Sequence, residues 1–513
     1  FEGKDKIKYS VLGIGLVWFI AMVEFGLFGF LITNYEVLFF FFFFLPIIVA
    51  LSMGLYYAQT RNVSVFACAL FTLWLAGTIF MSFNGVRFIL LISPAFGVSF
   101  GLFWYFVVNR VTIILRSLFD NKESHWIQVS AILLVGIVFF LMWSPVHSNA
   151  LAASRGTFPS FDDAWHNAMY EIRDNSAEDA IITSWWDFGH FFHAIAERGV
   201  TFDGATQTRP QSHWVGKLFL ESDDSVSEDI LQMLVCGGNQ AFDTMQDIAN
   251  DSSGGVLVNK IIYDTLGRNN EETRAVLEQN DYFEFSSDEI DTIMEYLACE
   301  NPRENFVITS QDMVSKAPVW AHWGLWDFTR KFVSDNRGRM SAEEMAEMTD
   351  SDLALIEQYL DELRRIDIRV RAGEIRRTDA LNQWFSPYPQ YLTPSFNNCQ
   401  LSGSTVSCFD QVRIDLNDFS LTDTAQLPIK RLIIVDGDEL VVYEQDRDQG
   451  ADILIRNIDT APQALVAEYP HGNSLFTRLF FLDGLGVTRF EKFYDTNSVT
   501  TGRIIIWKTI WDD

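Results

Sequence analysis

The chain has 513 residues, 49% of them hydrophobic, and a formal net charge of −29. Residues 1–150 hold only 8 of the 38 basic and 6 of the 67 acidic residues, so the strongly acidic character belongs to the remainder. A surface of that kind excludes nucleic acid as a partner, because contacts to phosphates need clustered lysine and arginine. The uneven composition also excludes an entirely soluble protein.

The first 145 residues are predicted to form a multi-pass membrane domain. Five runs are long and apolar enough to cross a bilayer: residues 9–33, 37–58, 63–81, 86–108 and 127–143. The basic residues between these runs fall on the side of the N-terminus, namely Lys4, Lys6, Lys8, Arg61, Arg110, Arg116 and Lys122. The positive-inside rule therefore places the N-terminus in the cytoplasm and everything after residue 150 outside the cytoplasm.

Two further domains are predicted outside the membrane. Residues 146–385 read as an α-rich mixed α/β domain, with a short strand at 180–184, several helices, a second strand at 306–309 and a helical stretch at 311–330. Residues 386–513 contain β-branched and aromatic runs separated by turns, which predicts a C-terminal antiparallel β domain. Its expected strands are 430–435, 440–445, 453–455, 475–482, 489–494 and 504–510.

The first predicted strand ends in the run Trp185-Trp186-Asp187-Phe188-Gly189. A turn before the glycine could present both indole rings together with the carboxylate, which makes a small amphipathic pocket suited to a hydroxyl group. The simpler interpretation is that the rings belong to the core and Asp187 caps the following helix.

Other candidate residues are weaker when taken alone. Arg87 begins a membrane run at its external end, where a guanidinium either reaches the interface or binds a phosphate. Met313 and Lys316 lie one helical turn apart after the second strand, which is also typical of an ordinary amphipathic turn. Asp187, His190 and His193 are spaced three apart and could resemble metal ligands, although structural histidines are the better interpretation.

The five cysteines show no spacing typical of a metal site, and Cys236 and Cys299 fall in helical stretches. Cys399 and Cys408 enclose a loop rich in serine and glycine. A disulfide there is plausible in an extracytoplasmic domain, and the sequence leaves that bond open.

Taken together, these features resemble one family. The membrane part has a run, residues 86–108, that begins with Val-Arg-Phe; the external domain opens with Trp-Trp-Asp-Phe-Gly, and a later helix carries Met313 and Lys316. In this combination the chain resembles the catalytic subunit of oligosaccharyltransferase, most of all the archaeal dolichyl-phosphooligosaccharide-protein glycotransferases. The resemblance covers essentially the whole chain. It implies transfer of an oligosaccharide from a dolichol-type phosphate or pyrophosphate to the asparagine of Asn-x-Ser/Thr.

The resemblance also implies roles for particular residues. Trp185, Trp186 and Asp187 would hold the serine or threonine of the acceptor sequence, with Met313 and Lys316 completing the pocket, and Arg87 would contact the donor phosphate. Loss of the acceptor hydroxyl should leave Asp187 unpaired, and the threonine methyl should add burial, so threonine should be preferred to serine and both to alanine.

The sequence departs from the family in two places. Ser310 stands where the second pocket motif usually begins with aspartate, and Asp312 is displaced from that position. The external loops between the early membrane runs also lack the acidic residues with which the family binds Mn²⁺ or Mg²⁺. We therefore expect the chain to be a C-terminal portion with no catalytic residue or metal ligand of its own, with those ligands upstream of Phe1, and we expect it to be inactive alone.

Two alternatives stay open at this point. The chain could be a membrane-anchored protein that binds the acceptor sequence without catalysis. It could instead be a metal-dependent hydrolase that uses Asp187, His190 and His193.

Overall fold

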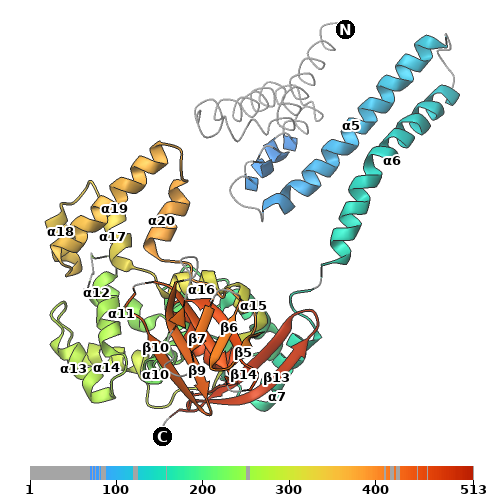
Figure 1. The fold of residues 1–513 in the computed structure, drawn as a ribbon. Coiled ribbons are helices and arrows are strands. Elements are labelled where there is room, and N and C mark those ends of the chain that lie inside the picture. Colours follow the sequence, from blue (N-terminus) through green and yellow to red (C-terminus); the bar gives the residue numbers. More distant parts are fainter. Residues whose placement is uncertain are drawn as a thin grey trace. The chain divides into compact units, whose positions relative to one another are not determined.

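The structure is a computed structural model. It describes residues 70–71, 73–75, 77–79, 81–82, 88–119, 125–157, 159–249, 253, 255–409, 412–415, 421–422, 428–447, 449–458 and 460–511. The chain divides into two compact units, Phe1–Thr157 and Phe158–Asp513 (Figure 1). Each unit is described by itself.

Two long helices make up most of the described part of the first unit. α5 (Ile89–Leu118) and α6 (His125–Arg155) pack through aromatic side chains, with the rings of Phe100 and Trp143 at 5.2 Å and those of Trp104 and Phe139 at 5.1 Å. Residues Leu90–Leu118 of α5 are long and apolar enough to cross a membrane. α6 meets the same test if its two parts, which are bent by 42° between Leu141 and Trp143, count as one span.

Only two of the five predicted membrane runs therefore fall on helices that the structure describes at length. The described residues contain one candidate span, or two with the bent helix. The runs at 9–33 and 37–58 lie outside the described residues, as does most of 63–81, and Arg87 is outside them as well.

A five-stranded mixed sheet organises the second unit, in the order β13-β14-β3-β1-β2. β1 (Ile181–Thr183) pairs in parallel with both β2 (Gly199–Val200) and β3 (Asn305–Ser310). β14 (Gly502–Thr509) pairs antiparallel with β3 and with β13 (Phe490–Ser498). Because β3 is buried along its whole length, both faces of the sheet must be covered.

Helices precede β1, fill the long connection to β3 and follow it. Their bounds are α7 (Asp163–Asn175), α8 (Gly189–Phe191), α9 (Gln211–Leu220), α10 (Asp224–Cys236), α11 (Gln240–Ala249), α12 (Val256–Thr265), α13 (Asn270–Gln279), α14 (Ser287–Leu297), α15 (Gln311–Ser315), α16 (Ala317–Gly324), α17 (Phe328–Asn336), α18 (Ala342–Thr349), α19 (Leu353–Arg371) and α20 (Arg377–Phe385). α9 and α16 cross at two glycines, because a Cβ on Gly216 would lie 2.3 Å from the carbonyl oxygen of Trp320. This close crossing holds the buried Trp320 in the core.

The C-terminal region contains two more sheets. One has the order β10-β9-β11-β12-β4, and the other has the antiparallel order β5-β6-β7-β8. Their strands are β4 (Asn397–Asn398), β5 (Gln400–Ser402), β6 (Thr405–Cys408), β7 (Val412–Asp415), β8 (Leu421–Thr422), β9 (Ile429–Asp436), β10 (Glu439–Glu444), β11 (Ala451–Arg456) and β12 (Gln463–Glu468).

Three expectations for this region need correction. β9 and β11 pair in parallel, so the larger sheet is mixed rather than antiparallel. The predicted strand at 475–482 is instead the helix α21 (Leu475–Phe481), which the Ser474 side chain caps and whose residues are almost all buried. A fully buried helix has no polar face, so its sequence carries no helical period to distinguish it from a buried strand. β13 and β14 join the sheet of β1 and β3, which ties residues 158–385 and 386–513 into one unit.

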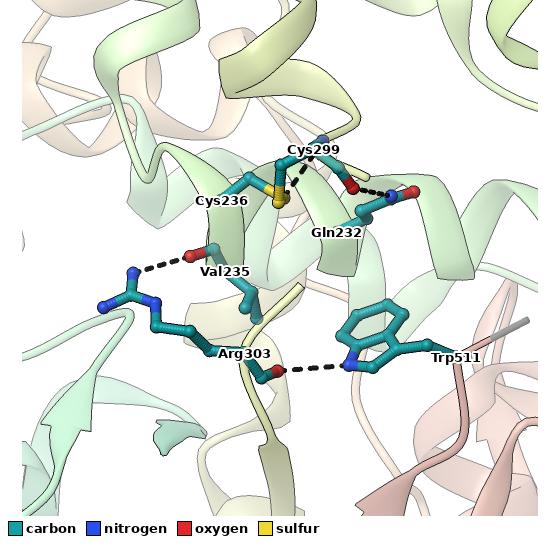
Figure 2. Close-up of a disulfide and its surroundings, with 6 residues drawn as sticks. All are labelled: Gln232, Val235, Cys236, Cys299, Arg303 and Trp511. Atoms are coloured by element: carbon teal, nitrogen blue, oxygen red, sulfur yellow. Dashed lines mark hydrogen bonds between the residues drawn. A yellow bond between two sulfur atoms is a disulfide. The ribbon is translucent and has the colours of Figure 1, made fainter. Parts of the chain in front are cut away.

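Two disulfides stabilise the second unit. Cys399 and Cys408 are bonded, which answers the question that the sequence left open. Cys236 and Cys299 form a second disulfide that the sequence analysis missed, and it joins the end of α10 to the segment after α14. Around it, Gln232 donates to the carbonyl oxygen of Cys299 at 3.0 Å, and Trp511 donates to that of Arg303 at 3.1 Å (Figure 2). The segment before β3 is thus fixed to both α10 and the end of the chain.

Candidate functional site

The Trp-Trp-Asp-Phe-Gly run begins just beyond the end of β1. Ser184 follows the strand, and Trp186–Phe188 form a single 3-10 turn that leads into α8. The Ser184 hydroxyl donates to the carbonyl oxygen of Ile308 on β3 at 3.0 Å. This bond fixes the start of the turn to the neighbouring strand, so the position of Asp187 is set by the sheet.

The second predicted motif follows β3 in the same way. β1 and β3 are adjacent and parallel, with Thr183 opposite Val307. The carboxyl ends of adjacent parallel strands meet at one edge of a sheet, which is where α/β proteins commonly place their ligand sites. α15 begins directly after β3 and brings the Lys316 ammonium to 3.1 Å from Asp187 Oδ1. Two segments far apart in the sequence therefore contribute opposite charges to one place.

Lys316 is held by two carboxylates. Its Nζ lies 2.8 Å from Asp312 Oδ2 and 3.1 Å from Asp187 Oδ1, and it also lies 5.2 Å from the centre of the Phe188 ring. Burial alone would lower the pKa of Lys316, but the two carboxylates outweigh it and raise that pKa above its ordinary value. The lysine is therefore a permanent cation at the site.

Asp312 is the residue that the sequence analysis undervalued. Its carboxylate accepts a hydrogen bond from the Ser310 hydroxyl and also contacts Lys316. Although Ser310 occupies the position expected for aspartate, the carboxylate two residues later reaches the lysine. The helical spacing of Asp312 and Lys316, four residues apart, was the signal that could have found this pair.

Met313 follows Asp312 in the sequence and is 2% exposed. Its sulfur is 3.7 Å from the Ser184 hydroxyl, and its carbonyl oxygen accepts a hydrogen bond from the Trp320 indole at 2.9 Å. The thioether therefore supports the turn that carries Asp187 and contributes little accessible surface in this structure.

The two tryptophans differ in their surroundings. Trp185 is 3% exposed, and its ring packs edge to face against Phe202 at 5.1 Å. The expectation that both rings would be presented with the carboxylate is therefore wrong for Trp185, because successive residues at a strand end point in opposite directions. Trp186 is half-buried and packs against the same core from the outside, next to Asp187, whose side chain is 25% exposed.

Gly189 explains how the motif meets the next segment. A Cβ at this position would lie 2.7 Å from the carbonyl oxygen of Phe202 and 2.6 Å from the Asp203 Cβ. Only glycine permits that approach. The contact seats Asp203 and Gly204 against the motif, and neither residue had been assigned a role from the sequence.

The histidines after the motif do not join Asp187. His190 Nδ1 and His193 Nε2 lie 3.5 Å and 4.0 Å from Asp203 Oδ2. They are carried by α8 and by a π-helical turn (Phe192–Ala196) rather than by one regular α-helix. Within the part of the chain that the structure describes, no three His, Cys, Asp or Glu side chains are grouped to hold a metal ion. The hydrolase alternative with Asp187, His190 and His193 as metal ligands is therefore wrong.

The geometry defines a class of site: a partly exposed ion pair, preceded in the sequence by the half-buried Trp186, at the carboxyl edge of parallel strands in a unit joined to apolar helices. A carboxylate accepts and an ammonium donates hydrogen bonds, so the pair can bind both the proton and the oxygen of a small hydroxyl group. The indole face offers apolar contact for the carbon that carries the hydroxyl.

Comparison with known proteins identifies relatives of this chain. The chain is 30% identical over 224 residues to the dolichyl-phosphooligosaccharide-protein glycotransferase of Methanocaldococcus jannaschii, a match that covers 43% of this chain and 23% of the relative. It is 28% identical over 170 residues to the enzyme of the same name from Methanococcus voltae, over 33% of this chain and 18% of the relative. The dolichyl-diphosphooligosaccharide–protein glycosyltransferase subunit STT3B of Arabidopsis thaliana is 29% identical over 129 residues, or 22% of this chain and 17% of the relative.

These matches confirm the resemblance predicted from the sequence: the chain is homologous to archaeal proteins named dolichyl-phosphooligosaccharide-protein glycotransferases and to a dolichyl-diphosphooligosaccharide–protein glycosyltransferase subunit of Arabidopsis thaliana. The matches span less than a quarter of the length of these relatives. No family model matches the chain. A comparison of structures finds the C. jejuni pglb C-terminal domain, at 10% identity and a TM-score of 0.28 over 67% of this chain and 98% of that one, and a score this low carries no argument.

Proposed function

We propose that this chain recognises the acceptor sequence Asn-x-Ser/Thr in protein N-glycosylation by transfer of a lipid-linked oligosaccharide. The observation that carries the proposal is the contact of 3.1 Å between Asp187 and Lys316, which unites the two motifs of the resemblance at one edge of the sheet. Relatives named for transfer from dolichyl-linked oligosaccharides to protein support it.

The recognition chemistry follows from the ion pair. The serine or threonine hydroxyl donates to Asp187 and accepts from Lys316, and it thereby inserts into an ion pair whose side chains are 25% and 32% exposed. The threonine methyl packs on the Trp186 ring and adds about 0.8 kcal/mol by burial. An alanine at the same place covers the ion pair without forming either hydrogen bond, at a cost of about 1–3 kcal/mol.

In this proposal Trp185 and Met313 support the pocket and do not contact the peptide. Both side chains are almost fully buried, so they hold the backbone of Trp186 and Asp187 rather than touch the peptide. Arg87 remains the predicted ligand of the donor phosphate or pyrophosphate, as the resemblance implies.

Transfer itself would need a divalent cation, Mn²⁺ or Mg²⁺ by resemblance. The described residues do not fit that group, because no three suitable side chains among them lie together. We therefore propose acceptor binding as the contribution of this chain and derive no catalytic step.

We also propose a multi-pass membrane protein with the second unit outside the cytoplasm. The apolar helix α5 and the bent helix α6 support the membrane part. The two disulfides of the second unit, Cys236–Cys299 and Cys399–Cys408, support an oxidising compartment for it.

Calorimetry on the full chain in lipid nanodiscs tests this function. Peptides that differ only as Asn-x-Thr, Asn-x-Ser and Asn-x-Ala should bind in that order, with the threonine peptide bound roughly 20- to 600-fold more tightly than the alanine peptide. Asp187→Asn should abolish most of the preference. Asp335→Asn is the matched control, since Asp335 also pairs with a lysine, Lys331, but on the distant helix α17. Equal affinity for the threonine and alanine peptides would refute the proposal.

A further inference from the structure

The second unit carries an area without charged side chains. Among the residues after 150, about a quarter are charged, yet the segments 159–161, 188–193 and 496–502 of the second unit contain no Asp, Glu, Lys or Arg. The second segment is rich in phenylalanine, and the third contains the turn between β13 and β14. Three uncharged segments from distant parts of an acidic chain are notable only if they lie together.

The structure brings them together around Asp162. The ring of Phe161 stacks on Phe191 at 4.5 Å and meets Phe188 at 5.8 Å, which joins the first segment to the second. Asp162 Oδ2 accepts hydrogen bonds from the hydroxyls of Ser498, Thr500 and Thr501, which joins the first segment to the third. The three segments therefore form one surface, which we call the uncharged patch.

Asp162 also fixes the orientation of the patch. Its other oxygen accepts from the backbone amides of Ala164 and Trp165 and caps α7. Burial would raise the pKa of Asp162, but the hydrogen bonds from the three hydroxyls outweigh it and lower the pKa to about 2. The carboxylate is thus ionised but fully occupied, and it clamps the β13–β14 turn to the first turn of α7.

The patch presents apolar side chains that the second unit leaves uncovered. Val499, at the tip of the turn, is 106% exposed, and Phe191 is 44% exposed. Apolar anchors on a surface whose central carboxylate, Asp162, is fully hydrogen-bonded are suited to the interfacial layer of a lipid bilayer, where free carboxylates would be repelled by phosphates.

A short connection joins the patch to the end of α6. Only six residues separate Arg155, the last residue of α6, from Asp162. Such a connection reaches at most about 25 Å. If α6 crosses the membrane as proposed above, the patch is confined to the neighbourhood of the membrane surface, where even weak apolar anchors are effective.

We infer that the uncharged patch docks on the bilayer interface, with Val499 and Phe191 as its anchors. The inference rests on the proposed function in one respect, namely the membrane location of α6. Docking would hold the turn of Trp186 and Asp187, which leads directly into Phe191, at a fixed height beside the headgroups. A lipid-linked donor carries its phosphate at that same level.

Site-specific fluorescence on the full chain tests this inference. The substitution Val499→Cys, in a Cys68→Ser background, is labelled with the environment-sensitive dye NBD and placed in phosphatidylcholine nanodiscs that contain headgroup-nitroxide lipid. We expect a blue shift of the emission and loss of most of the fluorescence to the nitroxide. Val442→Cys on β10 is the matched control, since Val442 is also an exposed valine of the second unit but lies outside the patch. The dye at this position should remain bright.

Three results would overturn the inference: no quenching at Val499, equal quenching at Val499 and Val442, or a blue shift without quenching, which would mean that protein rather than lipid covers the patch. The measurement is independent of peptide binding. Quenching at Val499 together with equal affinity for the threonine and alanine peptides would leave the docking standing while the proposed function fails.

Discussion

Two of the clusters of opposite charges in the second unit differ in their access to solvent. At the edge of the first sheet, Lys316 lies between Asp187 and Asp312, and these side chains are 25–32% exposed. In the C-terminal sheet, Arg431 meets Asp452 through both oxygens, and these side chains are 9% and 0% exposed.

The buried cluster is complete within itself. Asp452 also accepts from the backbone amide of Gly472 at 2.8 Å, and Arg431 donates to the carbonyl oxygen of Pro470 at 2.9 Å. The exposed cluster has oxygens and ammonium hydrogens left for a ligand. A charge cluster whose hydrogen-bonding atoms are all engaged within the protein can only stabilise the fold. A cluster with hydrogen-bonding atoms still available can exchange a contact for a substrate group.

Removing one partner of the buried cluster should produce the largest effect. Asp452→Ala leaves the Arg431 guanidinium unpaired in the core and should lower the free energy of unfolding by about 3–5 kcal/mol. Urea unfolding in detergent micelles, followed by tryptophan fluorescence, measures this change. The double variant Arg431→Met, Asp452→Leu should recover most of the loss, and a double variant as unstable as Asp452→Ala would contradict the comparison.

Acid should weaken the same region through His471. This imidazole is fully buried against Trp320 and Tyr391, and burial, assisted by Arg431, lowers its pKa from 6.5 to about 4. Between those values the unfolded chain binds a proton that the folded chain cannot, so stability is lost as the pH falls from about 6.5 to about 4, by roughly 3 kcal/mol.

The variant His471→Gln isolates that contribution. His213 is also buried with a pKa lowered to about 4, and Asp229, whose pKa is raised to about 6, acts in the opposite direction, so wild-type stability alone mixes these groups. The destabilisation of His471→Gln relative to wild type should therefore shrink as the pH falls through this window. A difference that stays constant with pH would show that His471 does not titrate on unfolding.

Substitution in the exposed cluster should act on binding instead of stability. Lys316→Met removes the donor to the acceptor hydroxyl and should weaken binding of the threonine peptide by about 1–2 kcal/mol, or roughly 5- to 30-fold. Lys331→Met is the matched control, because Lys331 pairs with Asp335 away from the site. Loss of folding stability in Lys316→Met comparable to that of Asp452→Ala would erase the distinction between the two clusters.

The parts of the site that the sequence predicted are those determined locally. Each motif follows a short apolar strand, so the positions of Asp187 and Lys316 at strand ends could be expected. The contact between them depends on β1 and β3 being parallel neighbours, which no local pattern specifies. The resemblance to a family, rather than the residues alone, supplied that link.

The parts that were missed depend on long-range packing. The burial of Trp185 follows from Phe202 on the next segment, and the disulfide of Cys236 with Cys299 joins residues 63 positions apart. The helix α21 was taken for a strand because its aromatic residues are buried on all sides, which removes the helical period. In each case the structure depends on contacts with residues that are distant in the sequence.

Asp312 should give the smallest effect, and it tests how the exposed cluster is built. In Asp312→Asn the lysine keeps Asp187, so threonine-peptide affinity should fall by less than about threefold, as expected for one partly exposed ion pair. Ser310→Ala should have a similar or smaller effect, and the double variant should be no weaker than Asp312→Asn, because Ser310 acts on the lysine only through that carboxylate. Additive losses in the double variant would instead show that Ser310 contacts the peptide itself.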